Sequence, residues 1–194
     1  MPPEISPEGS VLYFTSNRPR SDGERGDMNI WRVRRDEAGW GEPEILGSRF
    51  NSEAEDIHAV DTGDALWFAS NRDGGRGRSD IYRVSWEGAL LHLGEAINDE
   101  LSQPDLWVRE DGTVMILAIT DHPDGHGGDD LYISRYDGEA WSSPLNLGPM
   151  VNSNEYEYGP TFSRDGEFLL FTSHRSGSAD VYRVPMSWVL SGSR

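Results

Sequence analysis

The sequence predicts an all-β protein built from four copies of one antiparallel, four-stranded unit. A glycine turn followed by an apolar strand occurs four times, with the glycines at positions 9, 63, 112 and 166. A second element, an Asp or Asn before an aliphatic–aromatic pair, begins at positions 29, 80, 130 and 180. Both elements therefore recur about every 50 residues, a period typical of a repeated supersecondary unit.

Each copy contains four predicted strands. The first lies just before the glycine turn, at 4–6, 58–60, 106–108 and 161–163. The second follows the turn and is apolar at consecutive positions, as from Val114 to Ile119, which is typical of a strand covered on both faces. The third carries the aliphatic–aromatic pair. The fourth is weaker, at 42–46, 89–93 and 144–147, and its Pro43 and Pro144 favour a sheet edge.

Four-stranded units at this period are typical of β-propeller blades. We therefore predict a β-propeller of four four-stranded antiparallel blades, at about 3–50, 51–98, 99–152 and 153–191, in a single domain spanning 1–194. A Leu-Gly pair, followed four residues after its Gly by Asn51, Asn98 or Asn152, closes the first three blades, but none follows Val184. The sequence does not decide between three arrangements: a closed ring, an open arc of a larger propeller, and half of a dimeric ring. An open arc would favour a homo-oligomer or additional blades.

Composition excludes several classes of function. Asp and Glu number 34 against 17 Lys and Arg, a formal net charge of −17, which argues against nucleic acid and anionic membranes as partners. Cysteine is absent, so disulfides, thiolate metal sites and a Cys nucleophile are excluded. The longest apolar run, Val114 to Ile119, is far shorter than the roughly 20 residues of a membrane helix, so we expect no membrane insertion.

One repeat resembles a known family. The segment from Ser163 to Ser173, followed by Asp180-Val181-Tyr182, resembles the TolB-type, WD-like β-propeller repeat. Segments 70–75 and 141–148 resemble its envelope branch, in which such repeats often precede an OmpA-type domain. The resemblance implies a periplasmic or cell-envelope protein. The residues themselves leave the location unknown, because no signal peptide opens the chain at Met1-Pro2-Pro3.

Functional residues are expected where the innermost strands break the repeat. Glu4, His58, Trp107 and Thr161 each lie five residues before a turn glycine and differ from one another. With Arg109, they form a predicted ligand-binding set at the mouth of the central channel. A Trp beside polar side chains suits a peptide or sugar. Ordinary packing of an inner strand is the alternative.

A second candidate site is the loop between the second and third strands of the third blade. Asp121, Asp124, Asp129 and Asp130 lie there with two histidines, and such oxygen-rich loops favour Ca²⁺. The spacing matches neither an EF-hand nor a helical zinc site, so a solvated acidic turn is the alternative. The recurring Arg before this loop and Asp after it (Arg72 and Asp80 in the second blade) predict a structural clamp across it.

No coherent catalytic set accompanies the repeats. We therefore expect a non-enzymatic scaffold of the TolB-like type, without a cofactor, that presents its channel mouth to a protein, peptide or glycan partner. One alternative is a propeller-fold glycan lyase or hydrolase with a channel site near His58. The other is a structural fragment of a larger propeller assembly.

Overall fold

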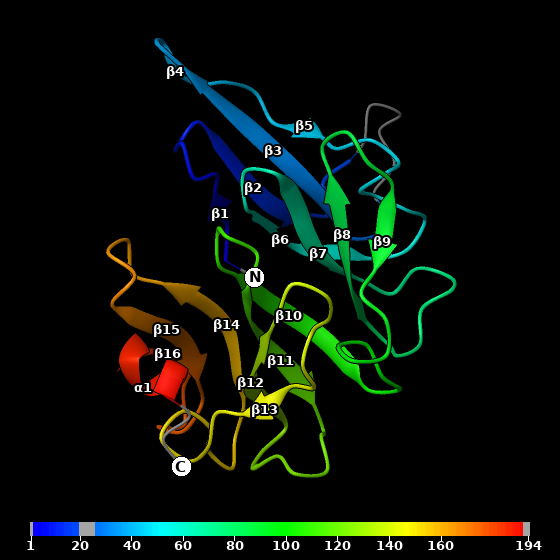
Figure 1. Cartoon of the computed structure of the whole chain (residues 1–194). Helices are drawn as coiled ribbons and strands as arrows, with labels where there is room; N and C mark the ends of the chain where they lie inside the picture. Colours follow the sequence, from blue (N-terminus) through cyan, green and yellow to red (C-terminus); the bar gives the residue numbers. More distant parts are fainter. Residues whose placement is uncertain (1, 20–25, 192–194) are drawn as a thin grey trace.

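The computed structural model describes residues 2–19 and 26–191, and the four-blade prediction is confirmed (Figure 1). Four antiparallel sheets follow one another around a common centre, near which the N-terminus lies. The first blade contains β1 (Glu4–Ile5), β2 (Val11–Ser16), β3 (Asn29–Asp36), β4 (Gly39–Trp40) and β5 (Glu44–Ile45). The second contains β6 (Asp56–Asp61), β7 (Ala65–Ser70), β8 (Asp80–Ser85) and β9 (Leu90–His92). The third contains β10 (Ser102–Val108), β11 (Val114–Thr120), β12 (Asp129–Arg135) and β13 (Leu145–Asn146), and the fourth β14 (Glu157–Phe162), β15 (Phe168–Ser173) and β16 (Asp180–Pro185).

The consecutive apolar residues of the second strands fill the spaces between neighbouring blades. In β11, Met115, Leu117 and Ile119 pack with the second blade, whereas Val114, Ile116 and Ala118 pack with the fourth. Side chains alternate across a strand, so a continuous apolar run covers both faces of a sheet. A third cluster joins the first and second blades. Stacking of successive sheets therefore forms the core, as predicted.

The turn glycines adopt the conformation that their recurrence indicates. Gly166 has φ of +71° and the equivalent Gly112 has φ of +68°, a region that residues with a Cβ rarely adopt. Each turn returns the chain from the innermost strand into the second strand of the same blade, β14 to β15 and β10 to β11. The turns therefore set the register on which the channel lining depends.

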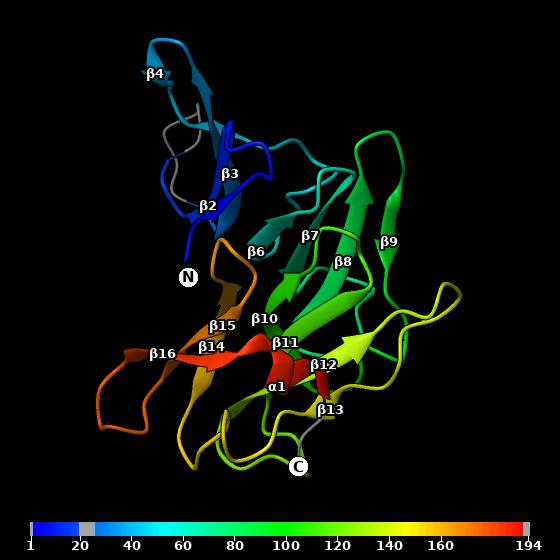
Figure 2. The same ribbon diagram turned by 60° about the vertical axis from the view of Figure 1, so that its left-hand side comes forward.

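The fourth blade departs from the repeat. Its sheet has three strands, because the chain enters a short helix, α1 (Met186–Ser191), after β16 instead of forming a fourth strand. Met186 and Val189 are buried in a cluster of side chains from the third and fourth blades. Figure 2 shows α1 directly after β16. In the described residues, α1 is the one helix, and it is too short to span a bilayer.

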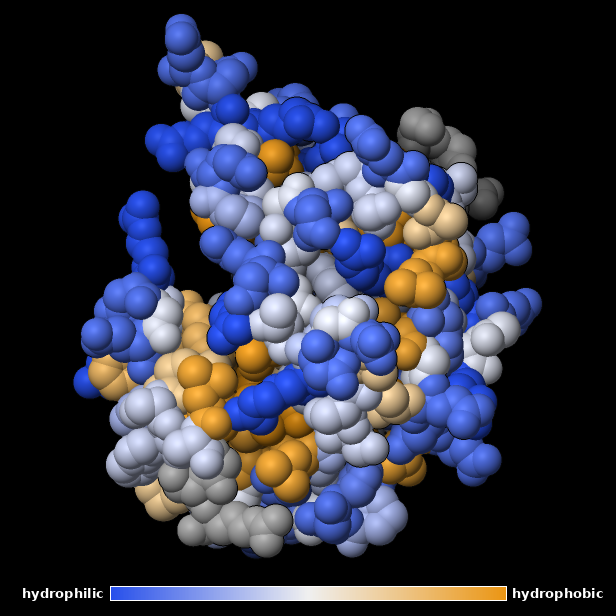
Figure 3. Space-filling model, viewed as in Figure 1, coloured by the Kyte–Doolittle hydropathy of each residue, from blue (hydrophilic) through white to orange (hydrophobic). Residues whose placement is uncertain are grey.

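An apolar hollow of about 330 Å³ lies where α1 meets the outer part of the third blade. Leu145, Met150 and Trp188 line it and are exposed. Figure 3 shows this region as a hydrophobic patch low on the viewed face.

The predicted pairing of the recurring Arg with the recurring Asp is wrong. Arg72 binds Asp56 of β6 at 2.5 Å, not Asp80. Asp80 instead accepts hydrogen bonds from the backbone N–H groups of Arg76 at 2.5 Å and Gly77 at 3.0 Å. Arg72 therefore links the end of the second strand to the innermost strand. Asp80 binds the loop backbone without help from Arg72.

Candidate functional site

The channel mouth brings together four of the five predicted binding residues. Glu4, Trp107, Arg109 and Thr161 line one pocket of about 810 Å³. Its walls come from the first, third and fourth blades, and Asp61 of the second blade also reaches it. In Figure 3 a notch separates the first blade, at the top, from the fourth, at the lower left. The mouth therefore opens between the two ends of the row of blades.

Register explains why three of these side chains share one level. Glu4 pairs with Tyr13, Trp107 with Ile116 and Thr161 with Leu170. Each partner lies four residues after its turn glycine, so the three positions are equivalent in the three blades. Equivalent positions of a propeller face the same height of the channel.

An aromatic pair forms one wall of the mouth. The rings of Trp107 and Phe162 have centroids 3.7 Å apart and planes 30° apart. Both side chains are half-buried, so part of each ring faces the pocket. Phe162 was not predicted from the sequence, although it is the immediate neighbour of Thr161.

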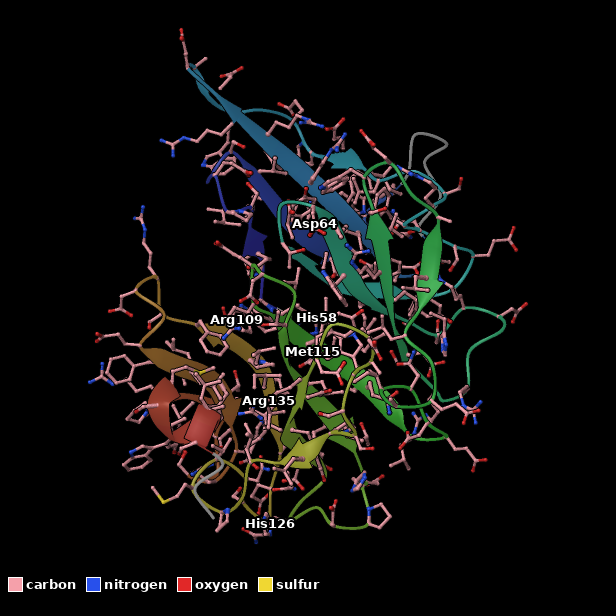
Figure 4. All side chains as sticks on the ribbon, in the orientation of Figure 1. His58, Asp64, Arg109, Met115, His126 and Arg135 are labelled. Carbon is pink, nitrogen blue, oxygen red and sulfur yellow. The ribbon has the colours of Figure 1, made fainter. Side chains whose placement is uncertain are left out.

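Arg109 is held at the rim of the pocket (Figure 4). Its guanidinium lies 2.8 Å from an Asp111 carboxylate oxygen, and it also donates to the Thr113 hydroxyl. The hydrogen bond from Arg109 lowers the pKa of Asp111 to about 2. Asp111 therefore stays ionised and keeps Arg109 in place.

Two carboxyl groups on the acidic side of the mouth, those of Glu4 and Asp61, have raised pKa values. Burial, followed by the nearby Asp61 carboxylate, raises the pKa of Glu4 to about 7, and His58 opposes this shift. Burial also raises the pKa of Asp61, although that carboxylate accepts hydrogen bonds from the Gly63 N–H and the Tyr13 hydroxyl. A raised carboxyl pKa means that the fold favours the neutral form.

His58 does not line this pocket, and the reason is a shorter turn. Val60, which lies only three residues before Gly63, pairs with Trp67 and occupies the position equivalent to Trp107 and Thr161. His58 falls instead in a bulge of β6, with φ of +51°. Counting five residues back from each glycine was therefore misleading in the second blade.

The His58 bulge has a counterpart in the fourth blade. Gly159 occupies the same place in β14 and has φ of +61°. The His58 side chain is only 6% exposed, and its Nδ1 lies against an Asp105 carboxylate oxygen and 3.2 Å from the Pro104 carbonyl oxygen. Its Nε2 is buried with no hydrogen-bond partner among the described residues. His58 thus lies inside the channel wall, below the mouth.

Asp105 is the residue that sequence reasoning missed. It is buried on β10, where one carboxylate oxygen faces His58 and the other accepts a hydrogen bond from the Gly159 N–H at 2.7 Å. It therefore joins the second, third and fourth blades. A Pro or Gly within a strand pattern indicates a bulge, so Pro104 and Gly159 could have signalled the region.

The predicted calcium loop spreads its carboxylates apart. Asp130 accepts backbone hydrogen bonds from His126 at 2.5 Å and Gly127 at 3.2 Å. Asp129 accepts from the Thr120 hydroxyl at 2.7 Å, and Asp124 lies against His122 and the Tyr132 hydroxyl. Over residues 2–19 and 26–191, no three His, Asp or Glu side chains are grouped closely enough to hold a metal ion. Asp121, at the loop entrance with φ of +53°, adds no ligand to such a group. A Ca²⁺ site at these four residues gains no support from this geometry.

Comparisons with known proteins agree with this architecture. No family model and no curated protein matches the chain. Among solved structures, TolB from Acinetobacter baumannii is similar over 96% of this chain and 40% of its own, with a TM-score of 0.58 and 18% identity. A putative TolB from Agrobacterium tumefaciens is similar over 99% of this chain and 58% of its own, with a TM-score of 0.59 and 19% identity.

A puromycin-hydrolyzing peptidase from Mycobacterium tuberculosis is similar over 95% of this chain and 27% of its own, with a TM-score of 0.57 and 17% identity. The chain thus spans between 27% and 58% of the length of these proteins. At this level of identity the likeness concerns the fold alone. The blade register, the clusters between blades and these similarities together establish that the chain has a TolB-like β-propeller fold.

Proposed function

We propose that this chain is a non-enzymatic propeller scaffold that binds an extended segment of a protein partner at its channel mouth. The observation that carries the proposal is the 810 Å³ pocket, which combines an aromatic wall with charged groups of both signs. Ligand pockets typically join apolar walls with a few placed polar groups.

Charge favours a peptide over a neutral sugar. Glu4 and Asp61 lie on one side of the pocket and Arg109 lies at its rim. A peptide carries amide groups and charged side chains that can complement both signs of charge, whereas a neutral sugar carries no charged group. The half-buried Trp107 ring offers contact area at small entropic cost.

An enzymatic centre at His58 has less support. A general base must reach the proton that it abstracts, and the His58 ring is 94% buried, against Asp105 and outside the pocket lining. The puromycin-hydrolyzing peptidase is similar to this chain in fold only. Location in the cell envelope stays a prediction from the family resemblance.

The test is selection of binders by the whole chain from a random peptide library, with an oligosaccharide array in parallel. We expect retained peptides to bind the Trp107→Ala and Arg109→Ala variants at least about tenfold more weakly. Trp40→Ala is the matched control, because Trp40 is 45% exposed on β4 at the far tip of the first blade. Thermal unfolding of each variant separates loss of contact from loss of fold.

Retention of peptides that bind Trp107→Ala and Arg109→Ala as tightly as the wild type would overturn the mouth as the site. Retention of oligosaccharides without any peptide would reassign the mouth to a glycan. Absence of any retained peptide or sugar would overturn the scaffold proposal.

A further inference from the structure

The outer edges of the first three blades are covered in the same way. In each, the Asn that follows the Leu-Gly pair binds the backbone of the third strand with its side-chain amide. Asn98 accepts from the Ile81 N–H at 2.7 Å and donates to the Ile81 carbonyl oxygen at 2.9 Å. The same pair of bonds joins Asn51 to Ile30 at 2.8 and 3.0 Å, and Asn152 to Leu131 at 2.8 and 2.9 Å.

The Leu of the same motif adds a third bond. Its N–H donates to the same carbonyl oxygen, at 3.1 Å from Leu46 to Ile30 and 3.0 Å from Leu147 to Leu131. The covering segment thus satisfies both outward backbone groups of one third-strand residue. That residue, Ile30, Ile81 or Leu131, is completely buried in each of the three blades.

The fourth blade has the same third strand but no cover. Val181 follows Asp180 in β16 as Ile81 follows Asp80 in β8, and Val181 is 73% exposed. Because the equivalent N–H and C=O groups point outward in three blades, those of Val181 do so too. Within the described part of the chain, no strand pairs with this side of β16, which we call the open edge. Figure 2 shows β16 as the last strand of its sheet.

Charge at the open edge indicates what fits there. In the first blade Arg32, on β3, binds Glu44 of the covering strand at 2.6 Å. Arg183 is the equivalent residue of β16, and its guanidinium lies over the Phe168 ring at 4.7 Å. None of the described carboxylates forms an ion pair with Arg183. An acidic residue two positions before the Leu of an incoming segment would complete the pair.

We infer that the open edge of β16 binds, in trans, an extended segment of a partner protein with the pattern Glu-x-Leu-Gly-x-x-x-Asn. Residues 44–51 of this chain show that pattern in its bound form. Backbone hydrogen bonds along an exposed edge supply affinity in strand addition, and alternate side chains supply specificity. In the proposed complex, the Asn of the partner segment forms hydrogen bonds with the Val181 backbone, and its Glu forms an ion pair with Arg183. This surface is separate from the channel mouth, so either proposal can fail alone.

The first experiment measures binding of a fluorescent peptide with the sequence of residues 42–52 to the whole chain. We expect saturable binding that weakens about tenfold when the peptide carries Asn51→Ala. Val181→Pro in the protein should abolish binding, because proline lacks the N–H that the peptide Asn must accept. Val181→Ala is the matched control and should bind as the wild type does. Unfolding curves confirm that both variants fold.

The second experiment exchanges charges. Arg183→Glu in the protein should weaken binding of the unmodified peptide about tenfold, and a peptide with Glu44→Arg should restore it. Restoration by the swapped pair cannot arise from general damage to the fold.

Three results would overturn the inference. One is absence of saturable binding at about 1 mM peptide. Another is binding that ignores Asn51→Ala and Val181→Pro. The third is a concentration-dependent dimer, seen by sedimentation and lost in Val181→Pro, which would assign the open edge to a second copy of this chain.

Discussion

The second and fourth blades place equivalent residues of one repeat in opposite environments. Ile81 is completely buried, and Val181, at the same position, is 73% exposed. Their own strands pair alike, Ile81 opposite Ala69 and Val181 opposite Thr172. Ile81 is covered both by the segment with Ile97 and Asn98 and by side chains of the third blade such as Met115, and among the described residues neither cover has a counterpart beside β16. Burial in this repeat is therefore supplied by the part of the chain that follows the strand, its covering segment and the next blade together.

Truncation of these two residues should give the largest measurable difference between the two blades. Ile81→Ala should lower the free energy of unfolding by about 4 kcal/mol, because it leaves a cavity among packed side chains. Val181→Ala should change it by less than about 0.5 kcal/mol, as at other exposed sites. Urea unfolding of both variants measures the contrast. Equal losses would mean that the exposure of Val181 does not describe the molecule in solution.

Removal of a covering Asn should have the next largest effect. Asn152→Ala should lower the free energy of unfolding by about 3 kcal/mol, because it leaves the N–H and C=O of buried Leu131 without their side-chain partner. Asn146→Ala should cost less, because Asn146 accepts hydrogen bonds from the Gly148 N–H and the Asn152 amide but does not bind Leu131 itself. Chemical unfolding provides the measurement. A loss under about 1 kcal/mol for Asn152→Ala would show that the Leu bond alone closes the edge.

The smallest effect concerns Glu4, at the opening between the first and fourth blades. Its pKa is about 7 in the fold against 4.5 as its ordinary value, so the neutral form stabilises the fold. That contribution is full below pH 4.5 and is lost as the pH rises through 7. Glu4→Gln mimics the neutral form. It should therefore stabilise the protein by roughly 2 kcal/mol at pH 8 and change little at pH 4.

Unfolding curves of wild type and Glu4→Gln across this pH range give the difference directly. An equal effect at pH 4 and pH 8 would show that Glu4 is well solvated and that the mouth is wider than described.

Much of this architecture was predictable, because period and apolar pattern depend on local chemistry. The positions of Glu4, Trp107 and Thr161 followed from counting back from a turn. The same count was wrong for His58, because the second turn is two residues shorter, so five residues before Gly63 falls in the bulge of β6 instead of at the level of Trp107 and Thr161. Helix α1 was not predicted, because Met186 and Val189 are buried by residues of the third and fourth blades that are distant in the sequence. Asp105 escaped notice because its partners come from two other blades.

The Asp105 carboxylate has a consequence for how the molecule comes apart. Repeat proteins can lose terminal units one by one when the interfaces between adjacent units are independent of one another. Here the Asp105 side chain binds the Gly159 N–H of the fourth blade and the His58 imidazole of the second blade, so the two interfaces of the third blade share one group. Loss of the C-terminal unit would remove the Gly159 N–H from the buried Asp105 carboxyl group, and an unsatisfied buried polar group is costly. The last three units should consequently melt as one cooperative block, despite the exposed flank of the final sheet.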